Sequence, residues 1–105
     1  MSNNLKRHYY LVEFIANKNL PESQLKAVLA TLSISQLKAI KEILVNILIG
    51  NLELTAIQIK KFSNYRLILR RLSYTSTGNK YFTVHRKLIA QIINAVLGKL
   101  KKLLE

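Results

Sequence analysis

Three short polar patterns divide this chain and indicate where its helices begin. They are Asn19-Leu20-Pro21-Glu22, Ser33-Ile34-Ser35-Gln36 and Thr55-Ala56-Ile57-Gln58. In each pattern the first side chain can accept a hydrogen bond from a backbone N–H that has no helical partner, while the Glu or Gln three residues later reaches back to the cap. Apolar residues at helical spacing follow each pattern, so the chain is predicted to be built from helices.

Five segments carry apolar residues at the spacing of a helix. Four of them are residues 5–17, 21–32, 35–49 and 56–74, and the fifth is a last helix that Thr83 is expected to cap. Several of these segments are apolar on more than one side, which favours packing against several neighbours. We therefore predict an all-α fold, a compact bundle of about five helices.

The connections between the predicted helices also have recognisable signals. Gly50-Asn51 is typical of a left-handed helix end, and the segment 56–74 is expected to bend near Ser63-Asn64. Residues 75–82 have the composition of an extended loop or a short hairpin.

Length and composition favour one helical domain over residues 1–105. Half of the residues are apolar, enough for one hydrophobic core. Because Cys is absent, disulfides and thiolate metal sites are excluded. No apolar run approaches the roughly 18 residues of a spanning helix or forms a signal peptide after Lys6-Arg7, so we expect a soluble or particle-associated protein. Leu104-Glu105 is a dipeptide that a cloning site leaves, and on that interpretation the natural chain continues further.

Residues that usually perform catalysis are few and dispersed in this sequence. Asp is absent, the five glutamates lie in separate segments, and the two histidines, His8 and His85, lie near opposite ends. A zinc site needs three or four ligands, and the three glycines stand alone rather than in a phosphate-binding loop. We therefore expect no enzymatic activity, no metal and no other cofactor.

Positive charge is concentrated in the second half of the chain. Residues 1–55 carry six Lys or Arg and four Glu, a net charge of +2, whereas residues 56–105 carry eleven Lys or Arg and one Glu, a net charge of +10. An ordinary solvated surface mixes both signs, so this imbalance favours a polyanionic partner. We predict DNA or RNA, bound through phosphates without base specificity. The predicted contact residues are Lys60, Lys61, Arg66, Arg70, Arg71, Lys80, Arg86, Lys87, Lys99, Lys101 and Lys102.

Two details refine this prediction. On one helix over 56–74, Lys60-Lys61 and Arg70-Arg71 would lie nearly three turns apart, a spacing suited to successive phosphates. Tyr81-Phe82 beside Lys80 is the best case for base stacking, although packing onto the last helix is the favoured interpretation of this pair.

The last helix supports two rival functions. Its apolar stripe from Leu88 to Leu104 ends among lysines, the pattern of a membrane-surface helix. The same stripe is suited to a homo-oligomer interface in a helical protein-interaction module. In so short a chain the core needs this stripe, so we favour a core role and rank the membrane surface below nucleic acid as a partner.

Four motifs occur in order between Leu37 and Gln91. They are Ile47-Leu48-Ile49-Gly50-Asn51, Leu54-Thr55 with Gln58, the basic segment Tyr65-Arg66 to Leu69-Arg70-Arg71-Leu72, and Arg86-Lys87-Leu88-Ile89. In this order, over about half of the chain, the sequence resembles small basic proteins of adintovirus- and Polinton-type DNA viruses of invertebrates. The resemblance implies a virion core component, located in the virion or the host nucleus, that neutralises and condenses DNA as the small basic core proteins of adenoviruses do. Where that group has a lysine-dense stretch, this chain has Thr75 to Asn79.

Overall fold

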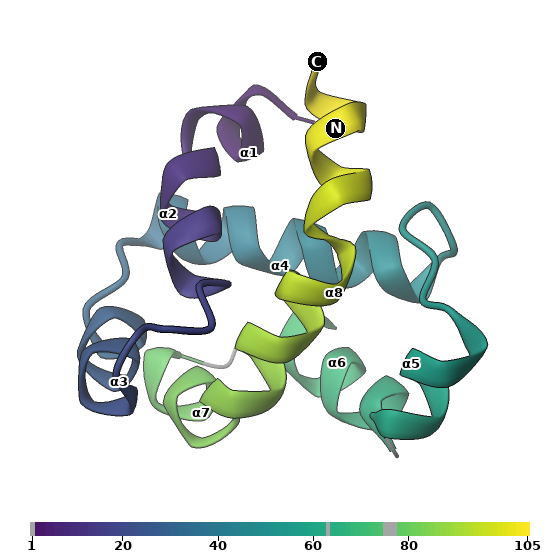
Figure 1. Cartoon of the computed structure of the whole chain (residues 1–105). Coiled ribbons are helices and arrows are strands. Elements are labelled where there is room, and N and C mark those ends of the chain that lie inside the picture. The colour runs from purple at the N-terminus through teal and green to yellow at the C-terminus, as the bar shows by residue number, and fades with distance from the viewer. Residues whose placement is uncertain (1, 63, 75–77) are drawn as a thin grey trace.

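The computed structural model describes residues 2–62, 64–74 and 78–105, and these residues form eight α-helices and no strand. The all-α prediction is therefore confirmed, whereas the expected number of about five helices is too low. Figure 1 shows the helices in chain order: α1 (Asn3–Arg7), α2 (Tyr9–Ile15), α3 (Glu22–Ala30), α4 (Ile34–Leu48), α5 (Ala56–Lys61), α6 (Tyr65–Tyr74), α7 (Asn79–Val84) and α8 (Arg86–Leu104).

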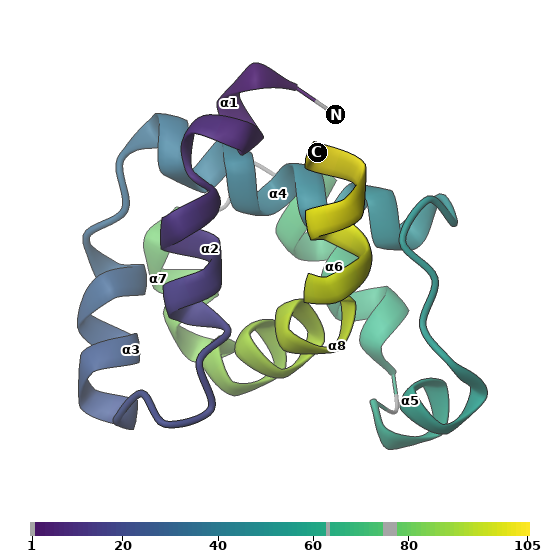
Figure 2. The same ribbon diagram turned by 45° about the horizontal axis from the view of Figure 1, so that its top comes forward.

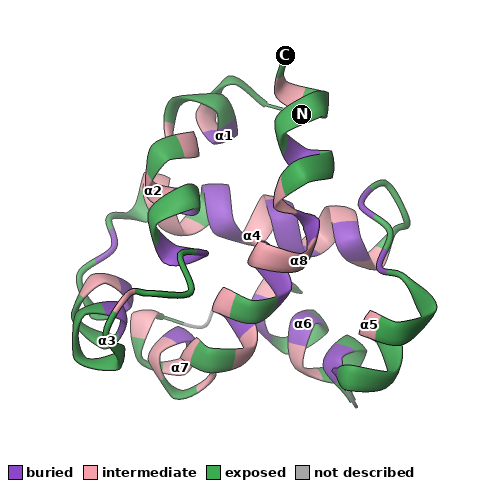
Figure 3. Cartoon of the chain, in the orientation of Figure 1, coloured by how far each residue is buried: buried purple, intermediate pink, exposed green. Residues whose placement is uncertain are grey.

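The two longest helices, α4 and α8, supply much of the hydrophobic core. Helix α8 packs against α2, α3 and α7, and α4 packs against α1 and α6. In Figures 1 and 2, α1, α2 and α3 lie on one side of α8, while α5 and α6 lie on the other. Figure 3 shows that buried residues line the inner faces of these helices and exposed residues line the outside. The radius of gyration, 12.5 Å, is that of a compact chain of this length.

The apolar stripe of the last helix faces inward. Its buried members are Ile89, Ile92, Ile93, Val96 and Leu100. These positions recur every three or four residues, so they share one face of α8 and point into the core together. The interpretation of the stripe as core is therefore confirmed.

Two of the three expected helix starts form complete capping boxes. At the start of α4, Ser33 Oγ accepts the Gln36 N–H at 3.1 Å, and Gln36 Oε1 accepts the Ser33 N–H at 2.8 Å. Thr55 and Gln58 form the same pair at the start of α5, at 3.2 and 2.9 Å. Both starts use only neighbouring residues, which explains why the sequence pattern predicts them correctly.

Two other predicted caps are wrong. Helix α3 begins at Glu22 with Pro21 in the cap position and no side-chain cap, so Asn19 does not cap it. The Glu22 carboxylate instead faces a basic pair at the start of α8. Thr83 lies inside α7, where its hydroxyl donates to the carbonyl oxygen of Asn79 at 2.9 Å.

Two residues with positive φ lie between helices. Gly50 has a φ of +90° just after α4, which confirms the predicted left-handed end. Asn64, with a φ of 61°, separates α5 from α6, so the expected bend is a complete break; Ser63 lies outside the described residues. Because of this break, Lys60-Lys61 and Arg70-Arg71 lie on different helices, and the prediction that they occupy one continuous helix is wrong.

The predicted segment 5–17 also divides, at His8. This residue leaves helical geometry, with φ −100° and ψ 17°, and its Nε2 lies 2.9 Å from Ser35 Oγ. The Ser35 hydroxyl donates to Asn4 Oδ1 at 2.6 Å, and Asn4 Nδ2 donates to the Ser35 carbonyl oxygen at 2.9 Å. These polar contacts tie α1 to the first turn of α4.

The segment expected to be a loop or hairpin contains a helix. Residues 75–77 lie outside the described residues, but 79–82 belong to α7, so an extended or hairpin conformation is wrong there. A six-residue helix is too short to be stable alone. Tertiary contacts hold it, because Asn79 Nδ2 donates to the Leu32 carbonyl oxygen at 2.9 Å and Phe82 is fully buried in the core.

Candidate nucleic-acid interface

The eleven predicted contact residues are distributed over four helices rather than gathered on one face. Helix α5 carries two of them, α6 three, α7 one and α8 five. All are exposed except Arg86, which is half-buried. Helix α8 has 19 residues and is therefore about 28 Å long, so its basic ends are widely separated. Its C-terminal end lies away from α5 in Figures 1 and 2.

Helix α6 presents a basic face to solvent. Tyr65, Leu69 and Leu72 are buried, which fixes the opposite side of the helix toward solvent. The exposed side chains at positions 67, 70, 71 and 74 share that outer side, because their spacing is three and four residues. They are Leu67, Arg70, Arg71 and Tyr74. Arg66, one turn before Arg70, borders the same face.

Arg66 and Lys99 donate hydrogen bonds to backbone carbonyl groups within the fold, as Arg86 also does. Arg66 Nη2 donates to the carbonyl oxygen of Leu48 at 3.3 Å, at the C-terminal end of α4. A positive charge there satisfies a terminal carbonyl and complements the helix dipole. Lys99 Nζ likewise donates to the carbonyl oxygen of Glu53. Both side chains therefore have structural roles that the sequence does not reveal.

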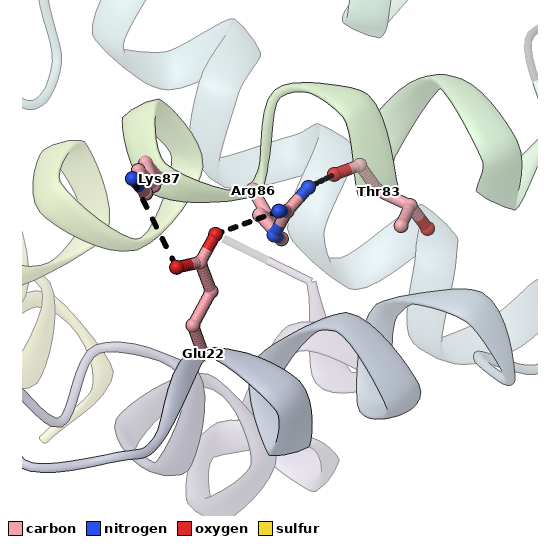
Figure 4. Close-up of polar contacts among 4 residues, drawn as sticks. All are labelled: Glu22, Thr83, Arg86 and Lys87. Atoms are coloured by element: carbon pink, nitrogen blue, oxygen red, sulfur yellow. Dashed lines mark hydrogen bonds and ion pairs between the residues drawn. The ribbon is translucent and has the colours of Figure 1, made fainter.

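Arg86 is held by two side-chain contacts within the protein (Figure 4). Its Nη2 lies 2.6 Å from Glu22 Oε1, and its Nη1 donates to the Thr83 carbonyl oxygen at 3.0 Å. Its side chain is only 25% exposed. Lys87 approaches the other carboxylate oxygen of Glu22 at 3.9 Å, with a side chain 73% exposed. These contacts join the start of α3 to the junction of α7 and α8, so Arg86 stabilises the folded state.

Replacement of Arg86 by methionine is expected to lower the free energy of unfolding by about 1 kcal/mol, because it removes a partly exposed ion pair and a hydrogen bond. Lys87→Met is the matched control, with a change within about 0.5 kcal/mol. Urea denaturation measures both. Equal changes in the two variants would contradict the structural role assigned to Arg86.

The side chains of five of the predicted residues form no hydrogen bond or ion pair with the part of the chain that the structure describes. They are Lys60, Arg70, Lys80, Lys101 and Lys102. Lys61 is placed differently, with Nζ 5.6 Å from the centre of the Phe62 ring. Among the predicted residues on α6, Arg70 is therefore the one whose side chain can bind an external anion without breaking a contact within the described chain.

Neither Tyr81 nor Phe82, the pair first considered for base stacking, is exposed. Phe82 is fully buried, and Tyr81 is half-buried with its ring 4.7 Å from that of His85. Packing, the favoured interpretation of this pair, is therefore confirmed. Tyr74 is 63% exposed on the outer face of α6, next to arginines. Tyr74 follows Arg71 by three residues and Arg70 by four. This spacing places the three side chains on one side of a helix, and it is the sequence signal that could have identified Tyr74.

Other kinds of site find no support among residues 2–62, 64–74 and 78–105. No three His, Cys, Asp or Glu side chains there come together as a metal site. No helix in these ranges combines the length and apolarity needed to cross a bilayer. Since the stripe of α8 is buried, a membrane-surface role through that stripe requires α8 to leave the core.

Comparisons with protein-family models, with curated proteins and with solved structures found no match to this chain. A functional proposal therefore depends on the charges and geometry of the chain itself.

Proposed function

We propose that this protein binds nucleic acid without sequence preference, through phosphate contacts, and performs no catalysis. The outer face of α6 carries the proposal, since it presents arginines beside an exposed tyrosine and has no acidic neighbour on the same helix. From residue 56 to residue 104 the sequence contains no carboxylate side chain. No carboxylate on α6 itself therefore competes with a phosphate for these arginines.

Arg70 and the other basic residues that form no ion pair are suited to phosphates because they are exposed and charged. Side chains of this kind position a protein on nucleic acid but do not read base edges. Their distribution over several helices favours contact with more than one strand or segment, as condensation requires. Together with the resemblance to small basic viral proteins, this supports a role in packaging DNA as a virion core protein.

Replacement of Arg70 and Arg71 by alanine is expected to weaken binding to a random-sequence DNA duplex about tenfold and to reduce the salt slope by about two, because two phosphate contacts are lost. Fluorescence anisotropy at several salt concentrations measures both quantities. The thermal unfolding midpoint should change by a few degrees at most, because both side chains are exposed and an exposed contact such as that of Arg71 contributes little to stability.

The matched control is Lys26→Ala with Lys38→Ala, which removes the same charge from exposed positions on α3 and α4. It should weaken binding much less. Equal loss in both double variants would mean that net charge alone drives binding and that α6 is not the interface. An RNA duplex of the same length tests the choice between DNA and RNA.

A protein-interaction or homo-oligomerisation role is the second candidate, and helix α5 is the observation that favours it. This helix has no buried residue, and Ile57 and Ile59 are 81% and 47% exposed. Exposed apolar side chains of this size can be covered by another subunit. Light scattering across a range of concentrations tests this candidate, which requires a mass above 12.1 kDa without nucleic acid.

A further inference from the structure

A groove with a volume of about 560 Å³ lies between α8, the connection from α2 to α3, and α5. In Figures 1 and 2 the connection and α5 flank the first half of α8 from opposite sides. The volume falls within the roughly 300–1,000 Å³ that is typical of binding sites. The groove is separate from the outer face of α6, because none of its lining residues belongs to that helix.

Three lysines from three different parts of the fold surround this groove. Lys18 belongs to the connection from α2 to α3, Lys61 to the end of α5, and Lys87 to the first turn of α8. Glu22 is the acidic residue among the lining residues. The Arg86 guanidinium neutralises its charge, with Nη2 2.6 Å from Glu22 Oε1. Lys87 Nζ lies 3.9 Å from Glu22 Oε2, which is a weaker contact. Lys87 can therefore turn to an external carboxylate without leaving Glu22 unpaired.

The walls of the groove are held in place by polar contacts. Asn94 Nδ2, on α8, donates to the carbonyl oxygen of Ala16 at 2.9 Å. Asn17 Oδ1 accepts the Asn19 N–H at 2.9 Å, which fixes the turn that carries Lys18. Lys61 lies over the Phe62 ring. Lys18 therefore lies on an ordered turn and Lys61 lies over an aromatic ring, and preorganisation of this kind lowers the entropy lost on binding.

Small and apolar side chains line the groove between these lysines. The apolar ones are Ala16, Leu20, Leu25, Phe62, Ala90 and Ala95, and four amide side chains, Asn17, Gln58, Gln91 and Asn94, lie among them. The two alanines of α8 leave room there that a longer side chain would occupy. A surface of this kind fits an apolar side chain, whereas the sugar-phosphate backbone of nucleic acid offers none.

We propose that this groove binds an acidic segment of a partner protein, in which an apolar side chain enters the groove while flanking carboxylates bind the three lysines. Charge complementarity selects the carboxylates, and the apolar lining distinguishes such a segment from a phosphate chain. Lys61 and Lys87 are also predicted nucleic-acid contacts, but Arg70 and Arg71 lie outside the groove. The protein can therefore hold a polyanion on α6 and a partner protein in the groove.

The test uses the whole protein and a fluorescein-labelled peptide of three Glu-Leu-Leu-Glu repeats, measured by anisotropy. Replacing each Leu of the peptide by Ser is expected to weaken binding at least tenfold. Lys18→Glu with Lys61→Glu should also weaken it at least tenfold, whereas Lys26→Glu with Lys38→Glu, the matched control, should change it less than threefold. Ala90→Leu fills the groove without altering charge and should weaken binding at least fivefold at an unchanged unfolding midpoint.

Three results would overturn the proposal. In the first, the Ser peptide binds as tightly as the Leu peptide. In the second, the two charge-reversed pairs have equal effects. Either result would mean that net charge alone drives peptide binding. Alternatively, Lys18→Glu with Lys61→Glu could weaken DNA binding and leave peptide binding intact, which would assign the groove to nucleic acid. Arg70→Ala with Arg71→Ala should leave peptide binding unchanged, so failure of the α6 interface and failure of the groove are distinguishable.

Discussion

Phe82→Ala is expected to lower the free energy of unfolding by about 3–5 kcal/mol, because Phe82 is fully buried and its removal leaves a cavity beneath α7. Small domains have only about 5–15 kcal/mol of stability, so the variant should be close to unfolding at body temperature. Loss on this scale lowers the melting temperature by roughly 15 °C or more. Thermal denaturation followed by circular dichroism measures it.

Val84→Ala is the control for this prediction. Val84 lies two residues later on the same helix but is 62% exposed, so its change should stay within about 0.5 kcal/mol. A base-stacking role for Phe82 makes the opposite prediction, namely weaker nucleic-acid binding at unchanged stability. That outcome would show that Phe82 faces solvent and that α7 is not packed as described.

Between about 50 and 200 mM salt, the affinity for a random-sequence duplex is expected to fall about a thousandfold. This is the loss typical of a protein that makes about six phosphate contacts, because bound cations are released from the nucleic acid on association. The exposed basic side chains of the second half of the chain are numerous enough to make them. Fluorescence anisotropy across this salt range should give a straight line on logarithmic axes.

Two duplexes of unrelated sequence provide the control for the salt experiment, and their affinities should agree within about threefold. A steep salt dependence with a strong preference for one duplex would contradict binding through phosphates alone. Absence of binding at 50 mM salt would reject nucleic acid as the partner and leave α5, with its exposed isoleucines, as the surface to test for association between subunits.

Local signals predicted the parts of the fold that depend on neighbouring residues. The capping boxes at Ser33 and Thr55, and the helix end at Gly50, involve contacts within a few residues, so their energies are present in the sequence pattern itself. The inward stripe of α8 was predictable for the same reason, because its apolar residues recur with the period of a helix.

The candidate interface was only partly predictable. Sequence identified the eleven basic residues correctly as an excess of charge, but it placed Lys60 and Arg70 on one helix that Asn64 divides. It also gave no indication that Arg86 would pair with a residue 64 positions earlier in the chain. Such pairs depend on which helix ends meet in space, and this is not encoded in local spacing.

The sequence by itself determined that the chain is helical, where α4 and α5 begin, which face of the last helix is apolar, and that the second half of the chain carries a large positive charge. Only the tertiary structure decided that 79–84 is a helix, because contacts from Asn79 and Phe82 to distant residues outweigh its weak local tendency. The tertiary structure also decided which cations bind the protein itself and which face solvent, and it formed the groove between α5 and α8. These outcomes depend on distances between segments far apart in the chain, and packing of the whole core sets those distances.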